Sequence, residues 1–250
     1  HIVPVVEYTS GYFLTYGAIK SIVESADRYI QTAPFPEKAI ELLNEVVGHA
    51  RVKSGTGRGM LITPDMVNET VTLKTNIPVG AISGDERQKL LDLETEMKKE
   101  VIGQDEAIQA VSRTMQRLRA DVVKREKPAG VFLFVGPTGV GKTQTAKTLA
   151  KIYFGSPDRM IRFDMSEYQD PQSIDRLIGS ARLNEPGQLP SRIRDNPFSL
   201  ILLDEIEKAD KGILNIFLRV FDEGVMTDVF GKQVNFKQSI IIATSNAAAQ

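Results

Sequence analysis

The octapeptide Gly-Pro-Thr-Gly-Val-Gly-Lys-Thr at residues 136–143 decides the fold of this chain. It follows an apolar run at 131–135 that is typical of a buried strand, and it precedes a helix-like stretch that starts at Gln144. Glycines let the backbone of such a loop curl until its N–H groups converge on a phosphate, and the next helix points its positive end there. The pattern predicts a phosphate-binding loop for ATP or GTP. A glycine-rich turn that binds nothing is the alternative, and the flanking strand and helix disfavour it.

The residues of this loop have distinct expected roles. Lys142 is expected to bridge the β- and γ-phosphates as a point charge, which makes it a predicted catalytic residue. The Thr143 hydroxyl is expected to ligate Mg²⁺. The predicted cofactor-binding residues of the loop are Gly136, Pro137, Thr138, Gly139, Val140, Gly141, Lys142, Thr143 and Gln144.

A second motif is an apolar run from Phe198 to Leu203 that ends in Asp204-Glu205. A continuous run of this kind predicts a strand of a parallel sheet that is buried on both faces. At its carboxyl end, Asp204 is expected to hold Mg²⁺ through water, and Glu205 to orient and deprotonate an attacking water. Glu rather than Asp at position 205 favours hydrolysis over binding alone. A strand that ends in a solvated acidic turn is the alternative, because charged residues continue to Lys211.

A third motif has the same form, with a strand pattern at 239–243 that ends in Thr244-Ser245-Asn246. Asn246 is predicted to hydrogen-bond the attacking water or the γ-phosphate, as a third catalytic residue beside Lys142 and Glu205. Asn is also common in turns that end strands, so this motif alone would indicate only a turn. The other two motifs make a phosphate sensor the better interpretation.

Composition limits the class of protein. A chain of 250 residues with 42% hydrophobic content can bury a sizeable core in one or two domains. A formal charge of −1 and a pI near 6.3 provide no electrostatic footprint for nucleic acid, so no nucleic-acid partner is predicted. The absence of cysteine excludes disulfides and thiolate metal sites, and two histidines leave little for a site based on imidazole.

The sequence shows no membrane or targeting signal. No apolar stretch approaches the roughly 20 residues of a membrane span, and no signal peptide is visible. We therefore predict no membrane partner and a cytoplasmic location. Because the chain starts at His1 and stops at Gln250 directly after a strand pattern, we expect it to be an excised fragment, which makes a missing signal weak support.

The order of the patterns predicts an α/β fold. Strand patterns at 131–135, 160–164, 199–203 and 239–243 alternate with helices, as in the doubly wound parallel sheet of a P-loop NTPase. Residues 17–50 are instead expected to be helical, with two apolar stripes that we interpret as core, and Thr63-Pro64-Asp65 is expected to open another short helix. The stripes are Ala18, Ile22, Val23, Ala26, Tyr29 and Ile30, and then Ala39, Ile40, Leu42, Leu43, Val46 and Val47.

Between these two regions we expect linkers and a capping helix. The glycine-rich stretch 54–59 lacks the Gly-Lys-Thr ending of a phosphate site and is interpreted as a linker. Residues 76–80 form an extended connector. Ser83 and Glu86 then predict a capping box for a helix that reaches about Lys99.

With its three motifs in place, the chain resembles the Clp family of double-ring AAA+ protein unfoldases over nearly its whole length. The most specific matches are Val-Ile-Gly-Gln-Asp-Glu-Ala at 101–107, the loop at 136–143, Phe-Asp-Met-Ser-Glu-Tyr at 163–168 and Leu-Asp-Glu-Ile-Glu-Lys-Ala at 203–209. The resemblance implies that Val101 and Ile102 pack against adenine. It therefore implies ATP, with Mg²⁺, rather than GTP as the cofactor.

The resemblance also implies three domains. Residues 1–75 are expected to be the small helical lid domain of a preceding ATPase module, and 76–100 a connector with its capping helix. Residues 101–250 are expected to form a large AAA+ nucleotide-binding domain that is truncated after the sensor strand. The stretch ends before the positions where the family carries its arginine finger, second sensor and protease-docking loop.

Two features depart from the family pattern. Members usually carry a Gly-Tyr-Val-Gly loop whose aromatic side chain grips substrate in the central pore, whereas residues 180–186 are a shorter segment without an aromatic residue. Either Arg182 and Leu183 contact a translocating chain, or the trimmed loop grips weakly. No heptad pattern lies between Val47 and Thr63, so a coiled-coil middle domain is missing, which favours a simpler unfoldase or protease-coupled regulator over a disaggregase.

The resemblance thus implies an ATP-driven protein-remodelling motor, a homo-hexamer at full length, that acts on unfolded polypeptide and has a peptidase as a candidate partner. A nucleic-acid-directed AAA+ ATPase, such as a helicase or clamp loader, is one alternative, and the near-neutral charge counts against it. A ring scaffold that binds ATP with little turnover is another, which the missing aromatic favours and Glu205 opposes. We expect weak binding and slow hydrolysis from the 250-residue fragment alone, because it lacks the lid for its own nucleotide.

Overall fold

The computed structural model describes residues 2–31, 33–54, 59–75, 79–80, 84–120 and 126–246, and it divides into two compact units, residues 1–81 and 82–250. Residues 55–58 of the predicted linker, 76–78 of the predicted connector and Ser83 of the predicted capping box lie outside the described residues. None of the described helices combines the length and apolar composition that a membrane crossing requires.

The first unit is helical and includes one short parallel strand pair. Its helices are α1 (Ile2–Ser10), α2 (Tyr16–Tyr29), α3 (Glu37–Ser54) and α4 (Pro64–Thr75), and its strands are β1 (Phe13–Leu14) and β2 (Leu61–Ile62). The Thr15 hydroxyl caps α2 by accepting the N–H of Ala18 at 3.1 Å. The predicted stripes are largely buried, but Val23 is 47% exposed, because it lies beside rather than on the face that packs on α3 and α4.

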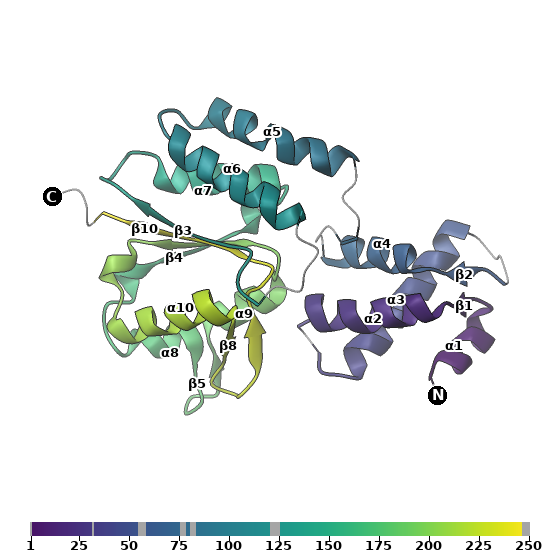
Figure 1. Cartoon of the computed structure of the whole chain (residues 1–250). Helices are drawn as coiled ribbons and strands as arrows, with labels where there is room; N and C mark the ends of the chain where they lie inside the picture. Colours follow the sequence, from purple (N-terminus) through teal and green to yellow (C-terminus); the bar gives the residue numbers. More distant parts are fainter. Residues whose placement is uncertain are drawn as a thin grey trace. The chain divides into compact units, whose positions relative to one another are not determined.

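The second unit is built on a parallel sheet, as the strand patterns predicted (Figure 1). Its strands are, in spatial order, β3 (Gly130–Val135), β10 (Ile240–Ser245), β7 (Leu200–Asp204) and β4 (Met160–Asp164). β7 and β10 are buried along their whole length because they occupy the two central positions. A strand that is buried on both faces has apolar residues at consecutive positions, which explains the continuous apolar runs in the sequence.

Strand register explains how the core is assembled. Ile161, Ile201 and Ile241 lie side by side across three strands, and the next row on the same face starts at Phe163. Alternate residues of a strand share a face, so these rows meet one layer of helices. That layer is α8 (Ser173–Ile178), α9 (Gln188–Asp195) and α10 (Lys211–Glu223), whose buried side chains belong to the same cluster.

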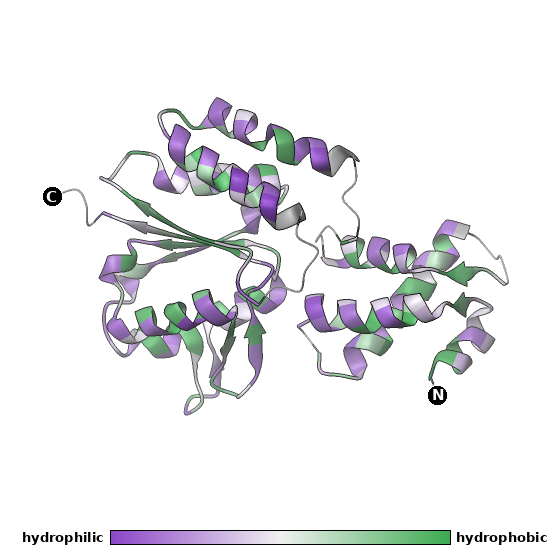
Figure 2. Ribbon diagram, in the orientation of Figure 1, coloured by the Kyte–Doolittle hydropathy of each residue, from purple (hydrophilic) through white to green (hydrophobic). Residues whose placement is uncertain are grey.

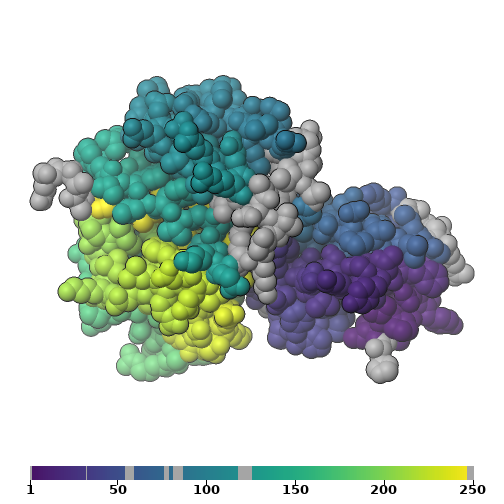
Figure 3. Space-filling view, viewed as in Figure 1, coloured from purple at the N-terminus to yellow at the C-terminus, as the bar shows by residue number. Residues whose placement is uncertain are grey.

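Helices cover both faces of this sheet, so the fold is the predicted α/β sandwich. In Figure 1, α5 (Gly84–Glu100), α6 (Asp105–Ala120) and α7 (Lys142–Tyr153) lie above the sheet and α8 and α10 lie below it. Figure 2 shows hydrophobic residues along the central strands and a mixture of both kinds on the helices. In the space-filling view, teal atoms cover the upper part of this unit and green to yellow atoms the lower part (Figure 3). Leu90, Leu93 and Met97 of α5 are buried, because their spacing places them on one face of the helix.

Short elements connect these layers. They are the hairpin of β5 (Gly179–Ser180) with β6 (Glu185–Pro186), the hairpin of β8 (Val225–Thr227) with β9 (Gln233–Asn235), and the 3-10 turns η1 (Pro157–Arg159), η2 (Met165–Glu167) and η3 (Ile206–Lys208). Some predicted boundaries were wrong by one or two residues: the helix after the phosphate loop begins at Lys142, two residues before Gln144, and β10 ends at Ser245, two residues after the predicted strand end. Gly141 turns the chain directly into that helix because its φ of 99° is left-handed, which glycine adopts without strain.

Candidate nucleotide site

The three motifs meet at one edge of the sheet. β3, β7 and β10 are parallel, so their carboxyl ends lie together, which is where open α/β sheets bind ligands. The phosphate loop leaves β3 at this edge, and the N–H of Gly136 donates to the carbonyl of Ser245 at 3.1 Å. This hydrogen bond fixes the start of the loop beside the end of the third motif.

The phosphate loop has the backbone conformation that its glycines predict. Gly139 and Gly141 have φ angles of 85° and 99°. A Cβ at Gly139 would meet no atom within 4 Å, so the left-handed backbone rather than crowding demands glycine there. Gln104, just before α6, donates from Nε2 to the carbonyl of Val140 at 2.8 Å. Gln104 belongs to the matched stretch at 101–107, but the sequence did not indicate that it anchors the loop.

Lys142 is held by neutral oxygen atoms. Its Nζ donates to the carbonyls of Gly136 at 2.6 Å and Pro137 at 2.9 Å, and to Oδ1 of Asn246 at 2.8 Å. An ammonium group has three N–H donors, so all of them have acceptors. A phosphate is a stronger acceptor than a carbonyl for a cation, so it can replace these partners.

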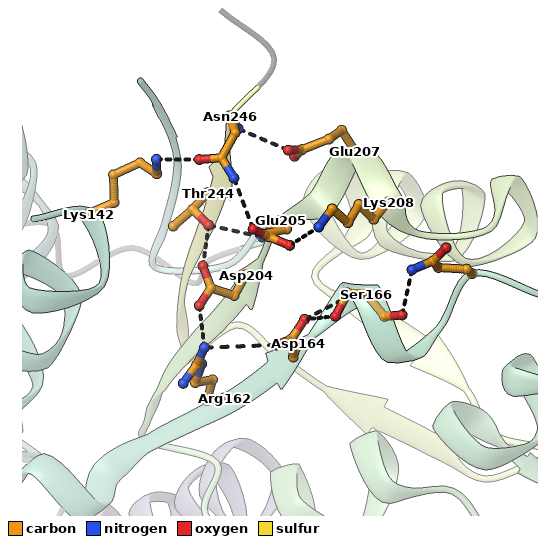
Figure 4. A network of polar contacts seen from close by, with 11 residues as sticks. Lys142, Arg162, Asp164, Ser166, Asp204, Glu205, Glu207, Lys208, Thr244 and Asn246 are labelled. Atoms are coloured by element: carbon orange, nitrogen blue, oxygen red, sulfur yellow. Dashed lines mark hydrogen bonds and ion pairs between the residues drawn. The ribbon is translucent and has the colours of Figure 1, made fainter. Parts of the chain in front are cut away.

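Asn246 joins Lys142 to Glu205, as Figure 4 shows. Its Nδ2 donates to Oε1 of Glu205 at 3.0 Å, and its backbone N–H donates to Oε1 of Glu207 at 3.0 Å. Burial alone would raise the pKa of Glu207, but the N–H of Asn246 and the other hydrogen bonds outweigh it, so the pKa is lowered. The three residues predicted as catalytic therefore form one hydrogen-bonded chain at the strand ends.

Glu205 has an unusual backbone and two side-chain partners. Its φ of 56° and ψ of 51° are left-handed, a conformation that is uncommon for residues other than glycine and is concentrated at functional sites. The hydroxyl of Thr244 accepts its backbone N–H at 3.0 Å. Oε2 of its carboxylate contacts Nζ of Lys208 at 2.5 Å, while Oε1 accepts from Asn246.

Asp204 is buried between two strands. Its Oδ1 accepts from the hydroxyl of Thr244 at 2.5 Å, and its Oδ2 lies 2.7 Å from Nη2 of Arg162 on β4. Arg162 also lies 4.0 Å from Asp164, whose pKa is lowered mainly because the Ser166 hydroxyl donates to it. Sequence reasoning missed Arg162 and Thr244, because their roles follow from strand order, which the sequence leaves open.

Thr143 and Asp204 remain the predicted Mg²⁺ ligands. Hydroxyl and carboxylate oxygens are the hard ligands that Mg²⁺ prefers, so the residue types fit. Thr143 lies in the first turn of α7, and both oxygens of Asp204 already have protein partners. This favours contact with the ion through water, as the sequence predicted for Asp204. Among the described residues, no three His, Cys, Asp or Glu side chains form a metal-binding group.

The two residues predicted to contact adenine differ in exposure. Val101 is 5% exposed and follows directly on α5, where its N–H donates to the carbonyl of Met97. Ile102 is 92% exposed, so its side chain is open to a ligand. An adenine contact at both positions stays a prediction.

Comparisons with known proteins identify the chain's relatives. The family model described as AAA domain (Cdc48 subfamily) matches residues 127–250, and the one described as AAA lid domain matches residues 6–77. The chain is 36% identical to the ATP-dependent Clp protease ATP-binding subunit ClpE of Bacillus subtilis, over 93% of this chain and 41% of that protein. It is 42% identical to the probable chaperone protein ClpB 1 of Chlorobaculum tepidum, over 94% of this chain and 53% of that protein.

A solved structure agrees over nearly the whole chain. The Hsp104:casein complex of S. cerevisiae in its extended conformation matches with a TM-score of 0.85 and 32% identity, and the match covers 98% of this chain and 43% of that one. The chain therefore spans about half the length of these three relatives, or somewhat less. The AAA+ fold and the resemblance predicted from the sequence are confirmed: the chain belongs to the Clp family of AAA+ ATPases.

Proposed function

We propose that this chain is the ATP-hydrolysing part of a motor that remodels proteins. The observation that carries the proposal is the hydrogen-bonded chain Lys142–Asn246–Glu205, which brings one residue from each of the three motifs to the edge where a nucleotide would lie. Hydrolysis of a γ-phosphate requires a cation that binds the phosphate, an amide that senses it and a carboxylate that acts as the base.

Each group has a proposed task. The N–H groups of the loop and Lys142 bind the phosphates, which frees Asn246 from Lys142. Asn246 then turns its amide to the γ-phosphate or to the attacking water, and Glu205 takes the proton of that water. Thr143 and Asp204 would hold Mg²⁺, which when bound neutralises charge on the phosphates. ATP is the proposed nucleotide, with Val101 and Ile102 at the adenine.

Polypeptide is the proposed substrate. The relatives are named as a subunit of an ATP-dependent protease and as a chaperone, and the solved relative is a complex with casein. These names favour a protein-remodelling motor over a nucleic-acid-directed ATPase. We also propose a homo-hexamer, a peptidase partner and a cytoplasmic location. These three proposals rest on the family resemblance alone.

The test is ATP hydrolysis by the full-length protein that carries this chain, wild type beside Glu205→Gln, with and without casein. We expect casein to stimulate the wild type and Glu205→Gln to lose hydrolysis in both conditions, because the amide cannot accept a proton. Hydrolysis that casein leaves unchanged would contradict a polypeptide motor, and hydrolysis that survives in Glu205→Gln would contradict the assigned base.

A ring scaffold that binds ATP with little turnover is the second candidate. The hairpin of β5 and β6 favours it, because its turn at 181–184 carries no aromatic residue and exposes Leu183. A scaffold would keep bound ATP intact for hours, whereas the motor would convert it to ADP. Nucleotide extracted from the protein after a timed incubation distinguishes the two.

A further inference from the structure

The carboxylate of Glu205 is held from two sides by partners of different kinds. Oε1 accepts from the neutral amide of Asn246 at 3.0 Å, and Oε2 forms an ion pair with Lys208 at 2.5 Å. The same amide of Asn246 also accepts a hydrogen bond from Lys142. A bound phosphate would therefore draw Asn246 away from Glu205. Within the part of the chain that the structure describes, the ammonium of Lys208 forms an ion pair with Glu205 alone. One oxygen of the carboxylate is therefore free to be released, and the other stays fixed.

Lys208 is placed by local structure. Glu205 precedes the 3-10 turn η3 and Lys208 ends it, so the two residues are three apart and their side chains come to the same side. The N–H of Lys208 also donates to the carbonyl of Glu205 at 2.9 Å, which closes the turn. Figure 4 shows the ammonium group pointing at the Glu205 carboxylate. The left-handed backbone of Glu205 thus directs its carboxylate between Asn246 and Lys208.

Charge around Lys208 supports the same placement. The hydrogen bond and the charge of Glu205 raise the pKa of Lys208 above its ordinary value, and Asp164 and Glu207 add to this effect. The ammonium therefore stays charged at neutral pH. Its side chain is 47% exposed, so the ammonium is a surface group. This ion pair therefore contributes little to the stability of the fold.

We propose that Lys208 is a positioning residue for ATP hydrolysis, which fixes Oε2 of Glu205 so that Oε1 faces the attacking water. The proposal rests on the hydrolytic function proposed above. A base must be held in the productive geometry by its neighbours, and a small displacement of the reacting group is costly. Lys208 does not touch the reacting atoms; it acts through Glu205 alone.

The test compares Lys208→Met, Lys208→Arg and the control Lys211→Met in the full-length protein that carries this chain. Methionine keeps the unbranched shape and most of the length of the side chain and removes the charge, while arginine keeps the charge. Lys211 is an exposed lysine at the start of α10. Steady-state hydrolysis gives kcat and KM, a fluorescent ATP analogue gives nucleotide affinity, and circular dichroism verifies the fold.

We expect Lys208→Met to lower kcat about tenfold or more with KM and nucleotide affinity unchanged. Lys208→Arg should return most of the rate, and Lys211→Met should match the wild type. The inference is overturned if kcat of Lys208→Met is unchanged or rises, if nucleotide affinity falls with it, or if arginine is as slow as methionine. A wild type that hydrolyses no ATP would overturn the proposed function as well. The contrary outcomes for Lys208→Met and Lys208→Arg would overturn only the role of Lys208.

Discussion

The hydrogen-bonded network of the site depends on a single residue, Asn246. Lys142 can only donate hydrogen bonds and the ionised carboxylate of Glu205 can only accept them, so a residue between the two must do both. The asparagine amide accepts from Lys142 at 2.8 Å and donates to Glu205 at 3.0 Å. Aspartate would repel Glu205, and leucine would contact neither group through hydrogen bonds. The network therefore requires an uncharged side chain at this position that both accepts and donates, and the amide of Asn246 meets that requirement.

Replacing Asn246 with alanine tests this requirement. We expect kcat for ATP hydrolysis to fall about tenfold, because a hydrogen bond to a charged group is lost at the reacting phosphate or water. ATP affinity should fall much less, because the loop and Lys142 are intact. Asn44→Ala, at an exposed position of α3, is the matched control and should leave both quantities unchanged. Equal losses of kcat in the two variants would disprove the assignment.

At the scale of elements, the ion pair of Arg194 and Asp228 joins α9 to the β8–β9 hairpin. Asp228 accepts from Arg194 at 2.5 Å and from the N–H groups of Phe230 and Lys232 at 2.9 and 2.8 Å. Burial alone would raise the pKa of Asp228, but these donors outweigh it and lower the pKa below its ordinary value of 3.8. The carboxylate therefore stabilises the fold above about pH 4, and this contribution is lost as the pH falls further.

Asp228→Asn should reduce the free energy of unfolding by about 2 kcal/mol at pH 7, because Arg194 loses its partner. Chemical denaturation of both proteins from pH 7 to pH 3 measures the difference. We expect that difference to stay constant between pH 7 and pH 4 and to shrink only below pH 4, where the wild-type carboxylate takes up its proton. A difference that closes between pH 7 and pH 5 would contradict the lowered pKa.

The base of the β5–β6 hairpin requires glycine. A Cβ at Gly187 would lie 2.1 Å from the carbonyl carbon of Ile178 and 2.4 Å from the N atom of Gly179, and backbone atoms cannot yield as a side-chain tip can. Gly187→Ala should therefore destabilise the protein by about 2 kcal/mol or more. Gly48→Ala, within α3 and with no atom within 4 Å of the new Cβ, should instead stabilise it by about 0.5–1 kcal/mol. Urea denaturation of the two variants checks the opposite signs.

At the scale of the whole molecule, the parts that the sequence predicted are those with strong local patterns. The strand at 160–164 has the predicted bounds, and the buried faces of α2, α3 and α5 follow their apolar spacing. The strands β1 and β2 were missed, because two residues carry no periodicity, and α1 was missed because it has no buried side.

The sequence likewise predicted some residues of the candidate site and missed others. The motifs named Lys142, Glu205 and Asn246, which do come together, because parallel strands place their carboxyl ends at one edge. Lys208 appeared in the sequence within the charged run after the second motif and within the matched stretch at 203–209, with no role of its own. Its contact with Glu205 follows from the turn at 206–208 and the left-handed backbone before it, and neither has a sequence signature.

The most direct test of the account is the affinity of the 250-residue chain for Mg-ATP, measured by titration calorimetry for the wild type, Lys142→Met and Lys147→Met. Both lysines lie on α7, but only Lys142 belongs to the network, while Lys147 is exposed. We expect weak but measurable binding by the wild type, a loss of about 10- to 100-fold in Lys142→Met, and no change in Lys147→Met. Equal affinity of all three proteins, or no binding by the wild type, would contradict a nucleotide site at this edge of the sheet.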